Sequence, residues 1–313
     1  MIFKNTIRLI VSNFSNVWKL LLYYVICIAL TALVCGWFLA PIAVKLGDAG
    51  VFASLIEFFE GIFTRSLGES ASVLSEIGTK ILDVLHVHME LRFNCIFIMA
   101  WLLFVFPISL KMGELALGEV LYGYMTSAVK YGFTGRYIKN FGKSFMYSLA
   151  HYFLALIFNV SCMVCFYFVV YFILQGGLQI LLAVLSFGLL IVIDALKLAV
   201  FSAWMPSISV LDLDAFSAIG MNFKTIKRTF FNIFSNMLLF IILAIVVNIV
   251  FAVFTATISL TITLPLTAFV FVVARMVSFF FSHGMKFYVY PDVVISPKTF
   301  EEQDRIKQMK HLI

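Results

Sequence analysis

Long apolar runs separated by short polar stretches make up most of the chain. Six of these runs are long enough for a membrane-spanning helix, which needs about 20 apolar residues. They cover residues 17–40, 93–112, 146–174, 178–202, 230–259 and 262–287. The pattern predicts an all-α polytopic membrane protein with about six transmembrane helices in three hairpins.

The connections between these runs differ in how clearly they are marked. QGGLQ at 175–179 predicts a tight hairpin, whereas SLTITLP at 259–265 is only weakly polar and Pro265 marks the start of the last helix. The longest polar segment, 46–92, repeats apolar residues at helical spacing, for example Phe52, Ile56 and Phe59. We expect it to form amphipathic helices on the membrane surface.

Composition agrees with a membrane protein. Of the 313 residues, 63% are hydrophobic and 12% are charged, and the mean hydropathy is +1.07. Soluble domains carry roughly 25% charged residues, so a soluble globular protein is excluded. We expect one membrane domain over 1–313.

The distribution of charge predicts the orientation of the spans. Cytoplasmic loops of membrane proteins carry an excess of Lys and Arg. Lys and Arg gather in the N-terminal flank, after the second span, after the fourth span and in 288–313, whereas seven acids oppose three cations in 46–92. We therefore expect both termini and the 288–313 tail in the cytoplasm and 46–92 outside it. Phe-rich, Lys-over-Arg usage suggests a bacterial chain, hence multi-pass insertion in the cytoplasmic membrane.

A short basic motif occurs twice. Residues 3–16 align without gaps on 223–236 with six identities, including F-S-N at the end of each copy, and 136–145 has a similar character. Such segments predict amphipathic interfacial helices whose cations meet anionic headgroups. The candidate headgroup-binding residues are Lys4, Arg8, Lys139, Lys143, Lys224, Lys227 and Arg228.

Three charged residues fall inside predicted spans, where charges are costly and usually face the protein interior. Asp194 and Lys197 lie one helical turn apart in the fourth span, and Arg275 lies at a depth comparable to Asp194 in the sixth. We hypothesise an Asp194–Arg275 ion pair. It would be either a site for an ion, a proton or a lipid headgroup, or a structural contact between hairpins.

Other candidate sites have simpler interpretations. Asp212 and Asp214 either cap a helix or bind a cation, and the capping interpretation is favoured. Asp83, His86 and Glu90 share a helical face, but a solvated polar face explains them better than a metal site. Cys162 and Cys165 form C-x-x-C inside an apolar run and are expected to be structural. No metal and no cofactor are predicted.

Close helix packing is expected near the end of the second span, where Gly113 and Gly118 would let helices approach. The same stretch contains Lys111, Glu114 and Glu119, which we assign to the cytoplasmic side. His151 and His283 have no recognisable partner in the sequence.

The two copies of the basic motif also carry a family resemblance. FKNTIRLIVSNFSNVWKLLL and FKTIKRTFFNIFSNMLLF, each leading into a span, resemble bacterial six-span membrane proteins related to the membrane domain of glycerophosphodiester phosphodiesterases. The resemblance implies a six-span membrane fold. Only a short tail follows the last predicted span, so it implies no catalytic role.

No nucleotide-binding, hydrolase or zinc-protease motif occurs in the sequence, and an enzyme is not expected. The main hypothesis is a non-enzymatic integral membrane protein that organises lipid or a protein partner, with a homo-oligomer left open. The alternative is a transporter or lipid-moving protein with a polar site near Asp194 and Arg275. An intramembrane lipid enzyme would need an acid/base pair that the sequence does not offer. Nucleic acid is not an expected partner, because membrane topology accounts for the basic residues.

Overall fold

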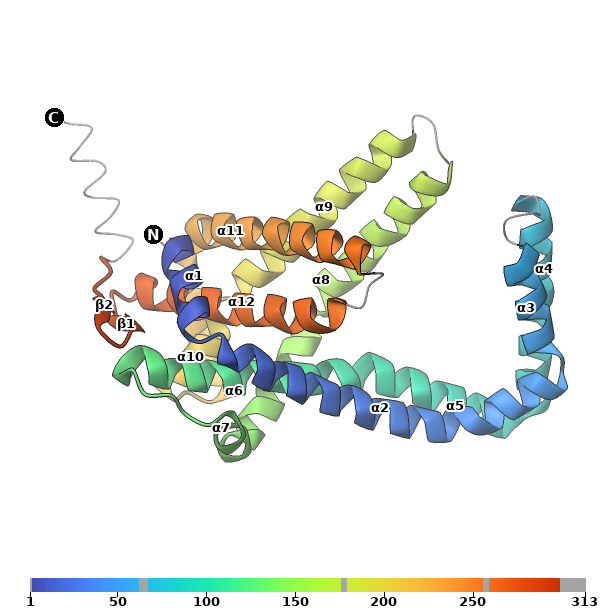
Figure 1. The fold of residues 1–313 in the computed structure, drawn as a ribbon, viewed down its shortest axis with the longest axis horizontal. Coiled ribbons are helices and arrows are strands. Elements are labelled where there is room, and N and C mark those ends of the chain that lie inside the picture. The colour runs from blue at the N-terminus through green and yellow to red at the C-terminus, as the bar shows by residue number, and fades with distance from the viewer. Residues whose placement is uncertain (1, 62–66, 176–178, 256–258, 299–313) are drawn as a thin grey trace. The chain divides into compact units, whose positions relative to one another are not determined.

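The computed structural model describes residues 2–61, 67–175, 179–255 and 259–298. This part of the chain is almost entirely helical, and six of its helical segments are long and apolar enough to cross a membrane. The protein is therefore an all-α polytopic membrane protein, as the hydrophobic pattern predicted (Figure 1).

The chain divides into two compact units. The main unit contains residues 1–24 and 108–313, and the small unit contains 25–107. Helix α2 (Ser15–Asp48) and helix α6 (Phe106–Ser127) contribute residues to both units.

The main unit holds most of the secondary structure. Its other elements are α1 (Ile2–Ser12), α7 (Phe133–Lys139), α8 (Phe141–Gln175), α9 (Gln179–Val200), α10 (Trp204–Leu211), α11 (Ala215–Phe254), α12 (Leu260–Ser282), β1 (Phe287–Tyr290) and β2 (Val293–Ile295). Helices α8 and α9 pair as a hairpin, and α12 packs against both α1 and α11 (Figure 1).

Helix α12 lies in the core of the main unit. About two thirds (67%) of its apolar stretch is buried, against 6 to 17% in the other five candidate spans. The fully buried aromatic side chains of this unit come partly from α12 itself and partly from other elements. Those of α12 are Phe269, Phe279, Phe280 and Phe281, and the others are Tyr124, Tyr147, Trp204, Phe240 and Phe287. The remaining spans expose apolar side chains, as helices that face lipid do.

The last helix ends earlier than the apolar run predicted. The predicted span continued to residue 287, but α12 ends at Ser282 and Phe287 begins a strand. The amide of Met285 donates to the carbonyl of Phe280, and Gly284 has φ +63°. This hydrogen-bond pattern with a left-handed glycine is a Schellman motif, which stops a helix even within an apolar sequence.

Other boundaries also differ from those predicted. Helix α11 ends at Phe254 rather than at residue 259, and α12 already begins at Leu260, so Pro265 lies inside the helix rather than at its start. Of the turn predicted at 175–179, Gln175 ends α8 and Gln179 begins α9, and residues 176–178 fall outside the described residues.

The two copies of the basic motif adopt different structures. The first forms α1, which ends at Ser12, and the Asn13 side chain beyond it donates to the carbonyl of Leu9 (3.3 Å) and to Ser12 Oγ (3.0 Å). Ile233 occupies the corresponding position of the second copy and cannot make such bonds. Residues 223–236 lie within the continuous helix α11 and do not form the predicted separate interfacial helix.

The small unit contains two amphipathic helices, α3 (Val51–Gly61) and α4 (Leu67–Val87), which pack against each other. Lys80 of α4 donates to Ser54 Oγ of α3 (2.9 Å) and pairs with Glu76. After His88 the chain continues as α5 (Met89–Ala100) and a π-helical turn, η1 (Trp101–Val105).

Candidate functional site

Arg275 is the most deeply buried cation among the described residues, with a side chain only 2% exposed. Its Nη1 donates to Glu114 Oε2 of α6 at 2.9 Å. Lys111, one turn before Glu114, donates to the same oxygen at 2.7 Å. Two cations therefore share one carboxylate between α6 and α12.

The prediction of an Asp194–Arg275 ion pair is wrong. Asp194 instead pairs with Lys197 on its own helix at 2.5 Å, and Lys197 also donates to Asn159 Oδ1 of α8 at 3.4 Å. Similar depth in two spans does not ensure that side chains meet, because rotation of each helix about its axis decides which way they point. The actual partner, Glu114, had been assigned to the cytoplasmic side.

Helix α8 contributes a buried polar face beside these charges. Its members are spaced i, i+3, i+4 and i+7, so they share one side of the helix: Ser144, Tyr147, Ser148 and His151. All four are buried. The hydroxyls of Ser144, Tyr147 and Ser148 have no hydrogen-bond partner among the residues that the structure describes, and neither has Nε2 of His151.

Trp204 of α10 holds the two aromatic members of this face in place. The Tyr147 ring meets Trp204 edge-on (5.3 Å between centroids, 85°), and the His151 ring stacks on it (5.7 Å, 28°). The indole Nε1 donates to the carbonyl of Ala215 at 2.8 Å. The rings are therefore fixed on a buried, hydrogen-bonded tryptophan.

The polar face of α8 and the charged residues form one neighbourhood. Tyr147 belongs to the same buried core as Leu115 and Met276, the chain neighbours of Glu114 and Arg275. The His151 ring packs on Phe201 (5.0 Å between centroids), one turn after Lys197. We call Lys111, Glu114, Tyr147, His151, Lys197 and Arg275 the intramembrane polar cluster.

Sequence reasoning found only part of this cluster. Lys197 and Arg275 were predicted as candidates, but Lys111, Glu114, Tyr147 and His151 were not connected to them. One signal was present, because the polar residues from Ser144 to His151 follow helical spacing.

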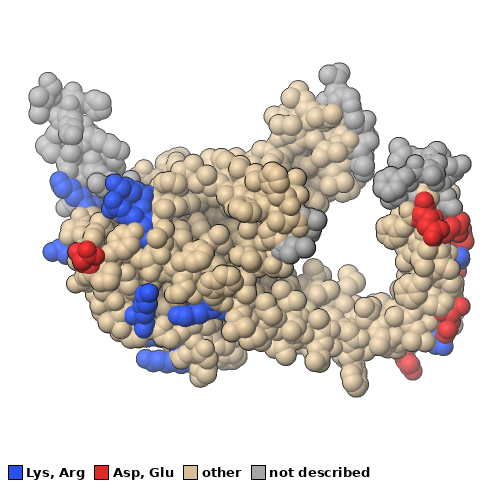
Figure 2. All heavy atoms as spheres, viewed as in Figure 1, with Lys and Arg blue, Asp and Glu red and all other residues tan. Residues whose placement is uncertain are grey.

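The candidate headgroup residues lie at one end of the main unit. In Figure 2 the Lys and Arg side chains of this unit gather around α1, α7 and the strands, and none is visible at the α8–α9 tip. Lys4, Lys139, Lys224 and Lys227 are exposed and Arg8 is half-buried. Lys143 forms an ion pair with Asp212 at 2.5 Å. The Arg228 side chain is not among those described.

Of the two aspartates before α11, Asp214 has the capping role that we favoured, whereas Asp212 follows the end of α10 and pairs with Lys143. Asp214 is the N-cap of α11 and accepts hydrogen bonds from the amides of Phe216 (3.1 Å) and Ser217 (3.0 Å). Hydrogen bonding with Ser217 lowers the pKa of Asp214. The hydrogen bond from Lys143 likewise lowers the pKa of Asp212.

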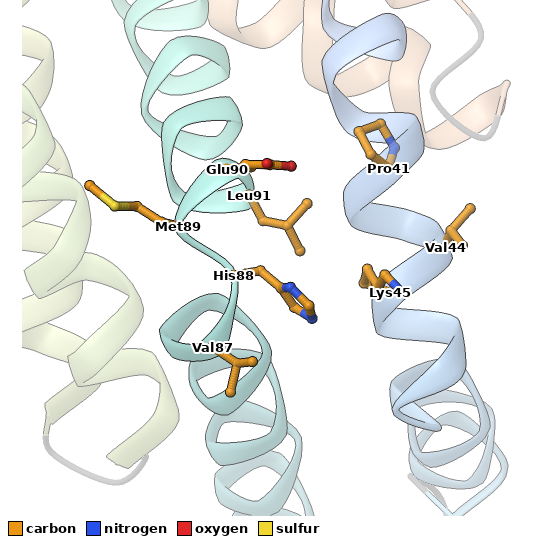
Figure 3. Close-up of a pocket in the computed structure, with 8 residues that line it drawn as sticks. All are labelled: Pro41, Val44, Lys45, Val87, His88, Met89, Glu90 and Leu91. Atoms are coloured by element: carbon orange, nitrogen blue, oxygen red, sulfur yellow. The ribbon is translucent and has the colours of Figure 1, made fainter.

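The small unit has an open pocket of about 500 Å³ beside the bend at His88 (Figure 3). Lys45 of α2 and His88 and Glu90 of the α4–α5 junction supply its polar groups, while Pro41, Val44, Val87, Met89 and Leu91 complete its lining. Lys45 already pairs with Asp48 at 3.7 Å. The pocket has few fixed polar groups and suggests no particular ligand.

No group of three His, Cys, Asp or Glu side chains suited to a metal ion occurs in the described part of the chain. All five cysteines are free, and Cys162 and Cys165 do not form a disulfide.

Comparisons with protein-family models, curated proteins and solved structures found no match. The resemblance to the membrane domain of glycerophosphodiester phosphodiesterases therefore stays a prediction. Any function must be argued from the polar cluster and the basic end of the main unit.

Proposed function

We propose that this chain is a non-enzymatic integral membrane protein of the cytoplasmic membrane that organises anionic lipid. The observation that supports it most directly is a set of four unpaired lysines at the basic end of the main unit. Lys4, Lys139, Lys224 and Lys227 are exposed, and none has an ion-pair partner among the described residues. Charges of this kind remain available to headgroups.

Exposed apolar side chains accompany these cations. Ile7 and Val11 follow Lys4 on α1, Ile138 precedes Lys139, and Phe223 precedes Lys224; all four apolar residues are exposed. Lysines beside exposed apolar residues suit the boundary between headgroups and acyl chains. Each Lys near an anionic surface contributes about 1 kcal/mol of attraction.

The lipid that co-purifies with the protein tests this proposal. The full chain is extracted with its surrounding membrane in polymer-bounded discs, and the ratio of anionic to zwitterionic lipid is measured by mass spectrometry. The variant Lys4→Gln/Lys224→Gln should lower the enrichment of anionic lipid several-fold, since two attractions of about 1 kcal/mol are lost.

A matched variant controls for the loss of charge itself. Lys45→Gln/Lys80→Gln also removes two positive charges, but from the small unit, where both lysines have carboxylate partners. It should leave the enrichment unchanged. Equal enrichment in the wild type and both variants would refute the proposal.

A lipid-moving or transport role is the second candidate. It is favoured by the buried Tyr147, His151 and Arg275 atoms that have no hydrogen-bond partner among the described residues, because polar groups inside spans often line a path. Proteoliposomes with fluorescent lipid distinguish the two, since only a lipid-moving protein lets an impermeant quencher bleach both leaflets.

A further inference from the structure

The intramembrane polar cluster and Asp194 have an excess of positive charge. Lys111, Lys197 and Arg275 are three cations, while Glu114 and Asp194 are two carboxylates. One positive charge is therefore not balanced by these ion pairs. An unbalanced charge among apolar helices is costly unless something compensates it.

The cluster also has more hydrogen-bond donors than acceptors. Glu114 Oε2 already accepts from both Lys111 and Arg275. Arg275 Nε, Tyr147 Oη and His151 Nε2 are buried without a partner among the described residues, and so is the hydroxyl of Ser278, one turn after Arg275. Arg275 Nε can only donate, and the hydroxyls and the imidazole can donate as well.

One kind of ligand corrects both imbalances. A phosphate group brings negative charge together with several acceptor oxygens. Arginine and lysine bind such groups through charge-assisted hydrogen bonds, which are stronger than neutral ones. A chloride ion would supply the charge but not several oxygens in fixed directions.

The exposed fractions of these side chains differ, and the most exposed ones indicate the side of the cluster from which a ligand could enter. The Arg275 side chain is 2% exposed, whereas those of Lys111 and Glu114 are 16% exposed and that of Lys197 is 21% exposed. Lys197 also donates to Asn159 Oδ1 of α8, the helix that carries His151. The open side of the cluster is therefore formed by two lysines from α6 and α9.

We propose that the intramembrane polar cluster binds one phosphate group, with Lys111 and Lys197 at the open side and His151 and Arg275 behind it. The group belongs either to a phospholipid headgroup or to free phosphate. This site is separate from the basic end of the main unit, because it shares no residue with Lys4, Lys139, Lys224 or Lys227. Either proposal can fail without the other.

Binding is measured in a phosphate-free environment. The full chain is reconstituted in nanodiscs of an uncharged galactolipid and titrated by calorimetry with inorganic phosphate and, separately, with a short-chain phosphatidylglycerol. Binding of the phospholipid alone identifies a headgroup site, and binding of both identifies a site that accepts free phosphate. The absence of binding by either probe overturns the proposal.

Two variants locate the binding site. Lys197→Gln should weaken binding about tenfold or more, since one charge-assisted hydrogen bond is lost, and His151→Phe should weaken it while keeping a ring stacked on Trp204. Lys45→Gln is the matched control, because Lys45 also pairs with an aspartate three residues away on its helix, and it should bind as the wild type does. If Lys197→Gln binds as tightly as the wild type, the proposal is wrong, whether or not His151→Phe folds.

Discussion

The carboxylate of Glu114 lies between two cations, since both Lys111 and Arg275 donate to its Oε2. A carboxylate in this position neutralises charge that would otherwise remain inside the helical core. Removing one member of a buried ion pair leaves the other charge uncompensated, which is much worse than never having the pair. Glu114 should therefore matter more to stability than any exposed acid.

We expect Glu114→Gln to reduce the free energy of unfolding by about 3–5 kcal/mol, because Arg275 would lose its counter-charge. Reversible unfolding in mixed micelles measures this. The matched control is Glu76→Gln, which removes the partner of Lys80 in an exposed pair and should cost about 1 kcal/mol or less. Combining Glu114→Gln with Arg275→Met should recover part of the loss; equal losses for Glu114→Gln and Glu76→Gln would contradict this account.

At the scale of elements, close approach of α6 to its neighbours shapes the main unit. The sequence predicted that Gly113 and Gly118 permit such approach, and the structure confirms it. A Cβ added to Gly113 would lie 2.6 Å from the Tyr23 ring, and one added to Gly118 would lie 2.4 Å from Met205 Sδ. Tyr23 is held in place, since its hydroxyl donates to the carbonyl of Ser109 at 2.6 Å.

Gly113→Ala should destabilise the protein by about 1–3 kcal/mol, the usual cost of overpacking, because the anchored Tyr23 ring must move. Gly188→Ala provides the control: it lies in α9, and nothing lies within 4 Å of an added Cβ. There, alanine should stabilise the helix by roughly 0.5–1 kcal/mol. Thermal unfolding of both variants checks the prediction, which fails if they shift the midpoint in the same direction.

At the scale of the whole molecule, charge separates the chain into two kinds of surface. The main unit carries the exposed lysines of α1, α7 and α11, while α3 and α4 of the small unit carry acids such as Glu57, Glu76 and Asp83. Positive residues are retained on the cytoplasmic side during insertion. This asymmetry predicts the topology of the chain.

Cysteine labelling tests that topology. In a variant without the five native cysteines, Lys80→Cys should react with a membrane-impermeant maleimide in right-side-out spheroplasts. Lys139→Cys should react only after the membrane is permeabilised, since it belongs to the basic side. The opposite labelling pattern would reverse the proposed orientation.

Particular residues show how far sequence alone could go. The sequence predicts Asp214 as a helix cap, because capping depends only on the residue and the three that follow it. It predicts Gly113 as a point of close helix packing, because small residues in a span let neighbouring helices approach. The sequence analysis did not identify Gly284 as the residue that ends the last helix. The predicted last span was therefore too long, and the β1–β2 hairpin was not predicted. Arg275 was recognised as buried, but its partner was misassigned.

The sequence by itself determined the helical membrane class, the six apolar spans and the location of the basic residues. These follow from length, periodicity and charge, which act locally and are enforced by the cost of placing polar groups in lipid. Only the tertiary structure decided that Arg275 meets Glu114 and that Tyr147 and His151 lie beside them. Such contacts depend on how each helix rotates and packs against others far away in the chain, and no local pattern specifies that rotation.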